Sequence, residues 1–325
     1  MIKVKRYLLK SLRAVQQKIW GKEQLKLVCE QDPNKASQLI IDALISRKPC
    51  MIARFGAFEL SIVVNYLGVN SDNKKVLNYI RGNEPDWWWS ESLIKYMNTN
   101  AGFFPPTIEK IEQFCQLMLN DIPQLDILGS WMQSENFIDD RLTGDKVHLR
   151  LLEPFWAKTP WTKALEGKKV LVLHPFDETI KEQYSKRNFL FEKEILPEFE
   201  LSTIKAIQSI GDSDTRFKDW FEALDFMKNE IDKIDYDICL IGAGAYGFPL
   251  AAHVKRSGKK AVHLGGSLQL LFGIRGNRWE DPNYGVKEWG IDKGSYVKLM
   301  NEYWVRPNEK DKPKNADAVE GACYW

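Results

Sequence analysis

The stretch of residues 235–279 decides the fold that we expect of this chain. It reads DYDICLI, then GAGAYG over residues 242–247, then FPLAAHVKRSG, KKAVHLGG and SLQLLFGIRGNRW. The apolar run at 237–241 ends in glycines, which predicts a buried strand that feeds a tight turn. A helix with an apolar stripe follows and ends at Gly258, and residues 261–264 predict the next strand. The stretch therefore predicts a β-α-β unit with glycine turns at two successive strand ends.

Such a unit directs backbone N–H groups and a helix N-terminus toward the space above the strand ends, where they favour phosphate oxygens. Gly242, Gly244 and Gly247 match the spacing G-x-G-x-x-G of dinucleotide-binding proteins. That fingerprint also needs an acidic residue at the end of the second strand, where this chain has LGG at 264–266. We therefore expect a nucleotide-diphosphate ligand and neither NAD nor flavin. The alternative is that the glycines only permit tight packing of strand against helix.

Polar and basic residues follow the second glycine turn closely. Gly265 and Gly266 end the predicted strand, and Gln269, Arg275 and Arg278 come soon after them. This order brings cations to the same edge of the sheet as the first glycine turn, which favours an anionic ligand over a purely structural role for the glycines.

A third glycine turn lies near the start of the chain. The short apolar run at 50–54 ends in Arg54, and the sequence RFGAFE places Gly56 in the turn and Glu59 at the start of the next predicted helix. An arginine at a strand end can pair with phosphate, and a glutamate beside it can bind a divalent cation. The alternative is a surface arginine and a glutamate that caps the helix.

His174 closes another predicted strand, which begins after Gly167. Asp177 and Glu178 follow it at the start of the next predicted helix. By position, these three side chains are the candidates for a general base. The alternatives are a structural histidine and a helix-capping aspartate.

Composition limits the classes of protein that the chain can belong to. With 325 residues it exceeds the size at which one core keeps growing, so we expect two lobes, 27–165 and 166–307, followed by a polar loop and C-terminal tail at 308–325. The net charge of +2 does not indicate a nucleic-acid-binding protein. Five scattered cysteines without a C-x-x-C motif indicate reduced thiols, and hence a cytoplasmic protein.

The N-terminal segment 1–26 has an unusual charge pattern, with eight Lys or Arg and one Glu. Its apolar residues recur at helical spacing, at Val4, Leu8, Leu12, Val15 and Ile19. This pattern is typical of a basic amphipathic helix on an anionic membrane surface, which predicts a peripheral protein on the inner face of the cytoplasmic membrane. The alternative is a terminal helix docked on its own domain.

Three consecutive tryptophans, Trp87 to Trp89, follow in a polar loop. Consecutive side chains cannot all face one core, so at least one is expected to line a surface or a groove. Such a surface suits sugars and lipids alike.

The chain resembles the GT-D-type glycosyltransferases, which are bacterial enzymes of surface polysaccharide and glycoprotein assembly. The motif RFGAFE at 54–59 is similar to the R-F-G-D-G-E of that family, and the late β-α-β unit that ends HLGG at 263–266 supports the resemblance. The last third also resembles uncharacterised bacterial proteins found with polysaccharide genes. The resemblance implies an α/β fold with a Rossmann-like core and a mostly parallel sheet, here with a helical N-terminal extension.

The resemblance also implies a function: transfer of a sugar from a nucleotide-diphosphate donor to a polysaccharide or glycolipid acceptor. In the family, the Asp and Glu of the motif serve nucleotide-sugar and metal binding. Glu59 matches and Ala57 departs, which leaves one carboxylate for Mn²⁺ or Mg²⁺. Two alternatives remain open, a non-catalytic module of a polysaccharide assembly complex and a dinucleotide-dependent oxidoreductase.

Overall fold

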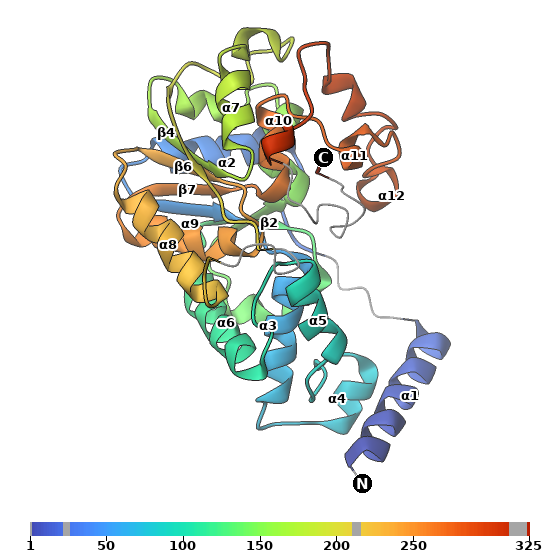
Figure 1. The fold of residues 1–325 in the computed structure, drawn as a ribbon. Helices are drawn as coiled ribbons and strands as arrows, with labels where there is room; N and C mark the ends of the chain where they lie inside the picture. Colours follow the sequence, from blue (N-terminus) through green and yellow to red (C-terminus); the bar gives the residue numbers. More distant parts are fainter. Residues whose placement is uncertain (1, 22–26, 210–215, 312–323) are drawn as a thin grey trace.

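The protein is an α/β fold built on a parallel sheet (Figure 1). The structure is a computed structural model that describes residues 2–21, 27–209, 216–311 and 324–325. Within these residues a seven-stranded sheet has the order β3-β2-β1-β7-β6-β4-β5, and every pairing in it is parallel. The strands are β1 Cys50–Ala53, β2 Ile127–Ser130, β3 Asp145–His148, β4 Lys169–His174, β5 Glu200–Lys205, β6 Ile238–Ile241 and β7 Lys260–His263. The α/β class expected from the sequence is confirmed.

The helices lie between and around these strands. They are α1 Ile2–Trp20, α2 Pro33–Ile45, α3 Ala57–Val69, α4 Val76–Arg81, α5 Glu91–Thr99, α6 Ile108–Asp121, α7 Asp177–Tyr184, α8 Trp220–Asp232, α9 Gly247–Arg256, α10 Leu268–Leu271, α11 Asn277–Glu280 and α12 Val286–Trp289. Short 3-10 turns precede two of them, η8 Gly244–Tyr246 before α9 and η9 Gly265–Ser267 before α10.

Two of the central strands, β1 and β6, are apolar along their whole length, as expected where helices cover both faces of the sheet. Every residue of β1 and β6 is buried. Strand β7 pairs with both, Met51 and Cys239 lying opposite Ala261 on its two sides. The carboxyl ends of these three strands therefore meet at one edge of the sheet, and the turns that follow them lie together.

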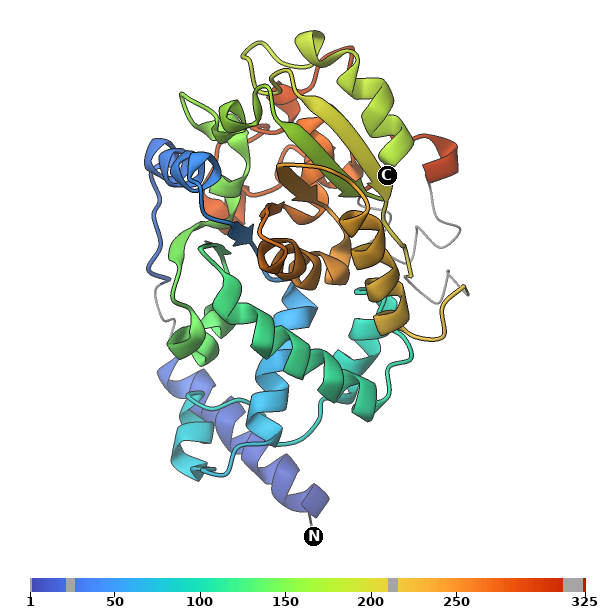
Figure 2. The same cartoon turned by 90° about the vertical axis from the view of Figure 1, so that its left-hand side faces the viewer.

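Two hydrophobic cores form on the two faces of the sheet. One contains Phe114 and Trp220 and lies under α3, α5, α6, α8 and α9. The other contains Trp161 and Phe272 and lies under α2, α7 and α10 (Figures 1 and 2). The result is a three-layer sandwich. Strands from both predicted lobes pair within it, because β1 of 27–165 is a direct neighbour of β7 of 166–307.

The predicted N-terminal helix is present as α1 and packs beside α4 at the end of the molecule farthest from the sheet (Figures 1 and 2). Residues 22–26 of the predicted segment lie outside the described residues. None of the helices in the described part of the chain is both long and apolar enough to cross a membrane.

Candidate functional site

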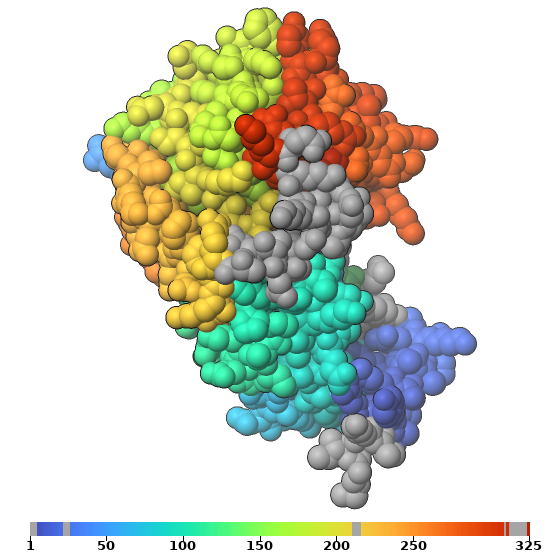
Figure 3. Space-filling model, viewed as in Figure 1, coloured from blue at the N-terminus to red at the C-terminus, as the bar shows by residue number. Residues whose placement is uncertain are grey.

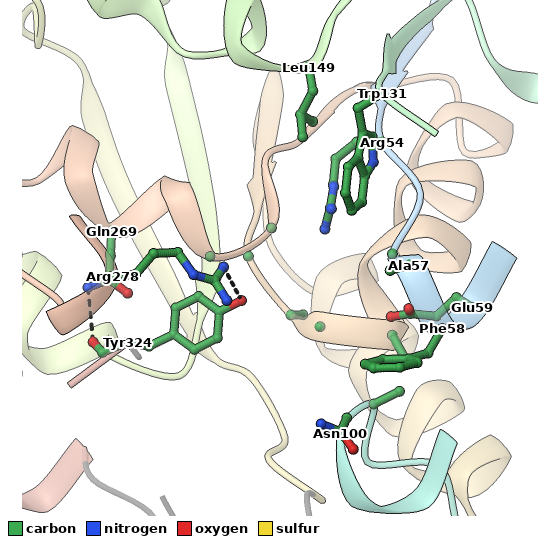
Figure 4. A pocket seen from close by; sticks show the side chains of 18 of the residues that line it. Arg54, Ala57, Phe58, Glu59, Asn100, Trp131, Leu149, Gln269, Arg278 and Tyr324 are labelled. Atoms are coloured by element: carbon green, nitrogen blue, oxygen red, sulfur yellow. Dashed lines mark hydrogen bonds between the residues drawn. The ribbon is translucent and has the colours of Figure 1, made fainter. Parts of the chain in front are cut away.

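A cavity of about 1120 Å³ lies at the carboxyl ends of the central strands. Its walls come from the turns after β1, β2, β4, β6 and β7, together with the last two residues of the chain. In open α/β sheets this edge is where ligands bind, because the loops there carry side chains and unpaired backbone N–H groups. Figure 4 shows Arg54 beside Trp131 on one side of the cavity and Arg278 with Tyr324 on another.

Arg54 follows β1 and is partly buried in the cavity wall. Its guanidinium carbon lies 5.4 Å from the ring centroid of Trp131, and one guanidinium nitrogen would lie 3.3 Å from a Cβ placed on Gly265. Burial lowers the pKa of Arg54, an effect that the nearby Glu59 opposes. Within the described residues, Arg54 makes neither a hydrogen bond nor an ion pair closer than 4 Å. Its N–H donors are therefore available to a ligand in the cavity.

Glu59 lies in the first turn of α3 and also lines the cavity. Its carboxylate turns back over Gly56, in the space that a side chain at that position would fill, and accepts hydrogen bonds from the N–H groups of Phe58 and Glu59. Burial raises the pKa of this carboxyl, while the backbone donors and Arg54 lower it in part. The helix-capping role considered for Glu59 is thus present together with its position in the cavity.

His174 lies at the end of β4 and lines the cavity, as expected from the sequence. Its Nδ1 accepts a hydrogen bond from the N–H of Phe176 over 3.0 Å, which makes Nε2 the protonated nitrogen of the neutral ring. Burial lowers the pKa of His174 to about 3. His174 is therefore neutral at physiological pH and can donate one hydrogen bond from Nε2.

The glycines of the fingerprint have two different physical roles. A Cβ on Gly242 would collide with the ring of His174, and one on Gly247 would collide with the ring of His263. Gly244, with a φ of +50°, has nothing within 4 Å of its Cβ position and lies in the backbone region that favours glycine. Of these three, Gly242 and Gly244 line the cavity and Gly247 does not. Tight packing thus explains two of the three glycines.

The opposite wall is built around the C-terminal residues. Tyr324 packs on Gly266, and Arg278 donates a hydrogen bond to its hydroxyl over 3.1 Å, with the guanidinium carbon 4.8 Å from the ring centroid. The Gln269 amide donates to the carbonyl of Tyr324 over 3.1 Å. Trp325 completes the wall beside this pair. These contacts hold the C-terminus against the strand ends (Figure 4).

Besides Gly247, two of the predicted site residues lie outside the cavity lining. Asp177 does not line the cavity; it faces Lys181 and Lys205 at 3.6 and 3.9 Å, because the first turn of α7 points it toward that pair. Arg275 also lies outside the cavity lining and donates to the carbonyl of Asn301 over 3.0 Å. Arg278, three residues later, lines the cavity instead.

Comparison with known proteins finds a likeness of fold. No family model matches the chain, and no curated protein matches its sequence. A solved structure described as "The highly conserved domain of unknown function 1792 has a distinct glycosyltransferase fold" is 11% identical, covers 93% of this chain and 95% of its own, and has a TM-score of 0.37. A selenomethionine-substituted structure of the same domain is 11% identical, with coverages of 94% and 96% and a TM-score of 0.36.

At this identity the likeness concerns the arrangement of helices and strands alone, and it assigns no residue of this chain a role.

A divalent cation does not fit the side chains that line the cavity. The described residues contain no group of three or more His, Cys, Asp or Glu that could hold a metal ion. Glu59, the predicted ligand, already uses its carboxylate on the N-terminus of α3, and Ala57 beside it carries no donor. One carboxylate is a poor ligand set for Mg²⁺ or Mn²⁺, which need several oxygen ligands.

Sequence reasoning missed Trp131, Tyr324 and Trp325, all of which line the cavity. Trp131 follows β2, and only the pairing of β2 with β1 brings it to Arg54. The sequence carried one usable signal, the apolar run before Trp131, which predicts a strand that ends there. For the two C-terminal residues no local pattern indicates a return to the sheet.

Proposed function

We propose that the cavity binds the diphosphate of a nucleotide sugar and that the protein transfers the sugar to a polysaccharide or glycolipid acceptor in bacterial cell-surface glycan synthesis. The observation that carries this proposal is Arg54, a partly buried guanidinium without a carboxylate partner among the described residues. Burying an unpaired cation is costly, so such a group favours an anionic ligand. Diphosphate oxygens match the geometry of a guanidinium, which can donate two parallel hydrogen bonds.

A second cation supports the same ligand. Arg278 lies close enough to Arg54 for its charge to add to the lowering of the Arg54 pKa. Two like charges facing one cavity repel each other, and a doubly charged diphosphate relieves that repulsion. The turn that precedes α9 lines the same space, and a helix N-terminus adds to the positive potential there.

The proposed chemistry uses charges already present in the cavity. When the bond between sugar and diphosphate breaks, negative charge grows on the leaving phosphate, and Arg54 stabilises it. Glu59, whose pKa burial raises, accepts the proton of the attacking acceptor hydroxyl. His174 donates a hydrogen bond from Nε2 to an oxygen of the donor and keeps its proton.

The cavity also supports a ligand larger than one sugar. Its volume of about 1120 Å³ is at the upper end of ordinary ligand pockets. Phe58, Trp131, Tyr284 and Trp289 contribute aromatic faces to its lining. Such faces suit the stacking of a nucleobase or of the apolar face of a sugar ring.

Two alternatives differ from this proposal in what they predict. A non-catalytic module would bind the nucleotide and neither transfer nor hydrolyse the sugar. A dinucleotide-dependent oxidoreductase would need an acid at the end of β7, where this chain has His263 and Leu264.

Donor titration by calorimetry tests the proposal directly. We expect nucleoside diphosphates and their sugar conjugates to bind, with and without Mg²⁺ or Mn²⁺. Arg54→Lys should weaken binding at least about tenfold, because an ammonium cannot reproduce a bidentate contact. The same change at Arg47, which is exposed on the loop after α2, is the matched control.

The outcomes separate the hypotheses. Binding with slow hydrolysis of the donor sugar supports a transferase, whereas binding without hydrolysis or transfer supports the module. If no nucleoside diphosphate or sugar conjugate binds under either condition, the proposed donor site is wrong.

A further inference from the structure

Helix α1 contacts the body of the protein through its polar side. Trp88 lies under two cations of the helix, with Arg6 at 5.3 Å and Lys10 at 5.5 Å from its ring centroid. Arg13 lies 4.8 Å from the ring centroid of Tyr79 in α4. These contacts are cation–π interactions, and they place the basic face of α1 against an aromatic surface. The docked arrangement considered for this helix is therefore present.

The carboxylate of Asp86 adds charge to this contact. It lies 3.7 Å from Lys10 and 3.5 Å from Arg13, and it accepts a hydrogen bond from the Tyr79 hydroxyl over 2.8 Å. Leu9, only 6% exposed, is a buried apolar residue of α1. The docked face of α1 is thus mostly basic.

The apolar stripe of α1 faces away from the body. The exposed fractions are 59% for Leu8, 42% for Leu12, 54% for Val15 and 62% for Ile19. These positions follow one another at helical spacing over about 16 Å. In the space-filling view α1 stands out at the edge of the molecule beside the helices below the sheet (Figure 3). An aligned row of exposed aliphatic side chains indicates a binding surface rather than scattered surface residues.

We propose that this stripe inserts into the surface of an anionic lipid bilayer, with α1 parallel to the membrane and still docked on the protein. The charge of the helix supports this occupant, since α1 contains Lys or Arg at six positions and no Asp or Glu. Two of these cations, Lys5 and Lys18, are exposed and lie on either side of the stripe. A helix with apolar centre and basic flanks matches the boundary between acyl chains and anionic headgroups.

A second copy of this chain fits the same surface poorly. Two α1 helices packed stripe to stripe would bring Lys5 and Lys18 of one copy close to the same cations of the other, without an acidic side chain on either helix to offset them. Such like-charge contacts disfavour association. An anionic bilayer removes this repulsion and covers the same apolar residues.

The docked face changes the salt dependence expected from the sequence. Arg6, Lys10 and Arg13 are already in contact with Trp88 or Tyr79, so Lys5 and Lys18 provide most of the described charge beside the stripe. Apolar insertion is insensitive to salt, whereas attraction between exposed charges is screened. Binding should therefore weaken with salt only in part.

Sedimentation of the full-length protein with vesicles tests the proposal. Phosphatidylcholine vesicles with and without phosphatidylglycerol serve as the probe. Leu12→Gln combined with Val15→Gln should weaken binding to the anionic vesicles at least about tenfold, because both side chains lie in the stripe. The control is Ile45→Gln combined with Ile108→Gln, two side chains with exposures of 63% and 50% on α2 and α6, which should bind as the wild type does.

Each outcome decides for or against the lipid surface. All variants should keep the wild-type melting temperature, since the changed residues are exposed. Lys5→Gln with Lys18→Gln should flatten the salt dependence while leaving apolar binding in place. The proposal is overturned if the wild type does not sediment with anionic vesicles, or if the stripe variant sediments equally well. A dimer in light scattering that the stripe variant abolishes, without vesicle binding, would assign the stripe to a second copy instead. No readout depends on sugar transfer, so this test is independent of the proposed function.

Discussion

Gly247 carries no side chain because the ring of His263 occupies the space that a Cβ would take. Its φ of −61° is helical, so alanine would fit the backbone there and fails only for steric reasons. We predict that Gly247→Ala lowers the free energy of unfolding by about 1–3 kcal/mol, the usual cost of overpacking a core. Urea unfolding measures this. In a His263→Ala background the cost should largely vanish, and an equal cost in both backgrounds would contradict the steric explanation.

Glu59 lies in the cavity and also caps α3, so its two roles need separate readouts. We predict that Glu59→Gln, which keeps the size and removes the charge, lowers the transfer rate about tenfold or more. Stability should fall by only about 0.3–1 kcal/mol, the value of a charge at a helix N-terminus. The measurements are the rate at saturating donor and the urea midpoint.

Glu109→Gln is the matched control for this prediction. Glu109 occupies the first turn of α6, as Glu59 does in α3, but it is exposed and lies outside the cavity. It should lose a similar stability and none of the activity. A wild-type rate for Glu59→Gln would exclude the carboxylate from the reaction.

At the scale of single residues, Arg54, Glu59 and His174 line the cavity as the sequence predicts, because each ends or follows a strand that an apolar run indicates. Arg275 lies outside the cavity lining, because the choice between that residue and Arg278 depends on an irregular turn whose hydrogen bonds are tertiary. The Arg275 N–H donates to the carbonyl of Val305, thirty residues later, and this pairing turns the side chain toward Asn301. Local spacing contains no information about such a contact.

At the scale of elements, the strand-turn-helix-strand unit was predictable because its signals are local. β6 is a continuous apolar run closed by a glycine, β7 contains the apolar pair Ala261 and Val262 and ends just before Leu264 and Gly265, and α9 has a buried stripe that ends before Gly258. β5 was not singled out, since it is an edge strand whose residues are partly exposed on both faces and so shows neither a buried run nor an alternation. At least one of Trp87 to Trp89 was expected to line a surface or a groove, and the ring of Trp88 forms part of the contact with α1.

The docking of α1 also predicts which of its cations matter for stability. Arg13→Gln removes the contacts with Tyr79 and Asp86, and we expect the free energy of unfolding to fall by about 1 kcal/mol. Lys5→Gln, on the exposed side, should leave it unchanged within about 0.5 kcal/mol. Urea unfolding of the two variants measures the difference. Equal effects would mean that α1 does not rest on α4 in solution.

At the scale of the whole molecule, the parallel sheet places two buried histidines beneath the cavity. His174 ends β4 and His263 ends β7, and burial lowers the pKa of each to about 3 from an ordinary value of 6.5. Both rings are therefore neutral at physiological pH, and each packs on a glycine that follows β6. Burial raises the pKa values of the carboxyls of Glu153 and Asp121 to about 7 and about 6. Their effect on the pH dependence of stability is therefore opposite to that of the two histidines.

The pH dependence of the free energy of unfolding follows from these pKa shifts. Comparing the wild type with His174→Gln separates the contribution of His174 from that of the buried carboxyls. Below pH 6.5 the unfolded chain protonates His174 while the folded protein does not, so its contribution is full above 6.5 and is lost as the pH falls toward 3. We predict that wild type loses up to about 1.4 kcal/mol per pH unit relative to His174→Gln between pH 6.5 and 5, since glutamine can accept the same hydrogen bond without titrating. Glu153 and Asp121 are present in both proteins, so their opposing contributions cancel in the difference. Urea midpoints at pH 7, 6 and 5 provide the measurement. Parallel pH profiles of the two proteins would mean that His174 is protonated in the folded protein. That result would be incompatible with the hydrogen bond that His174 accepts from Phe176 and with its burial beside Gly242.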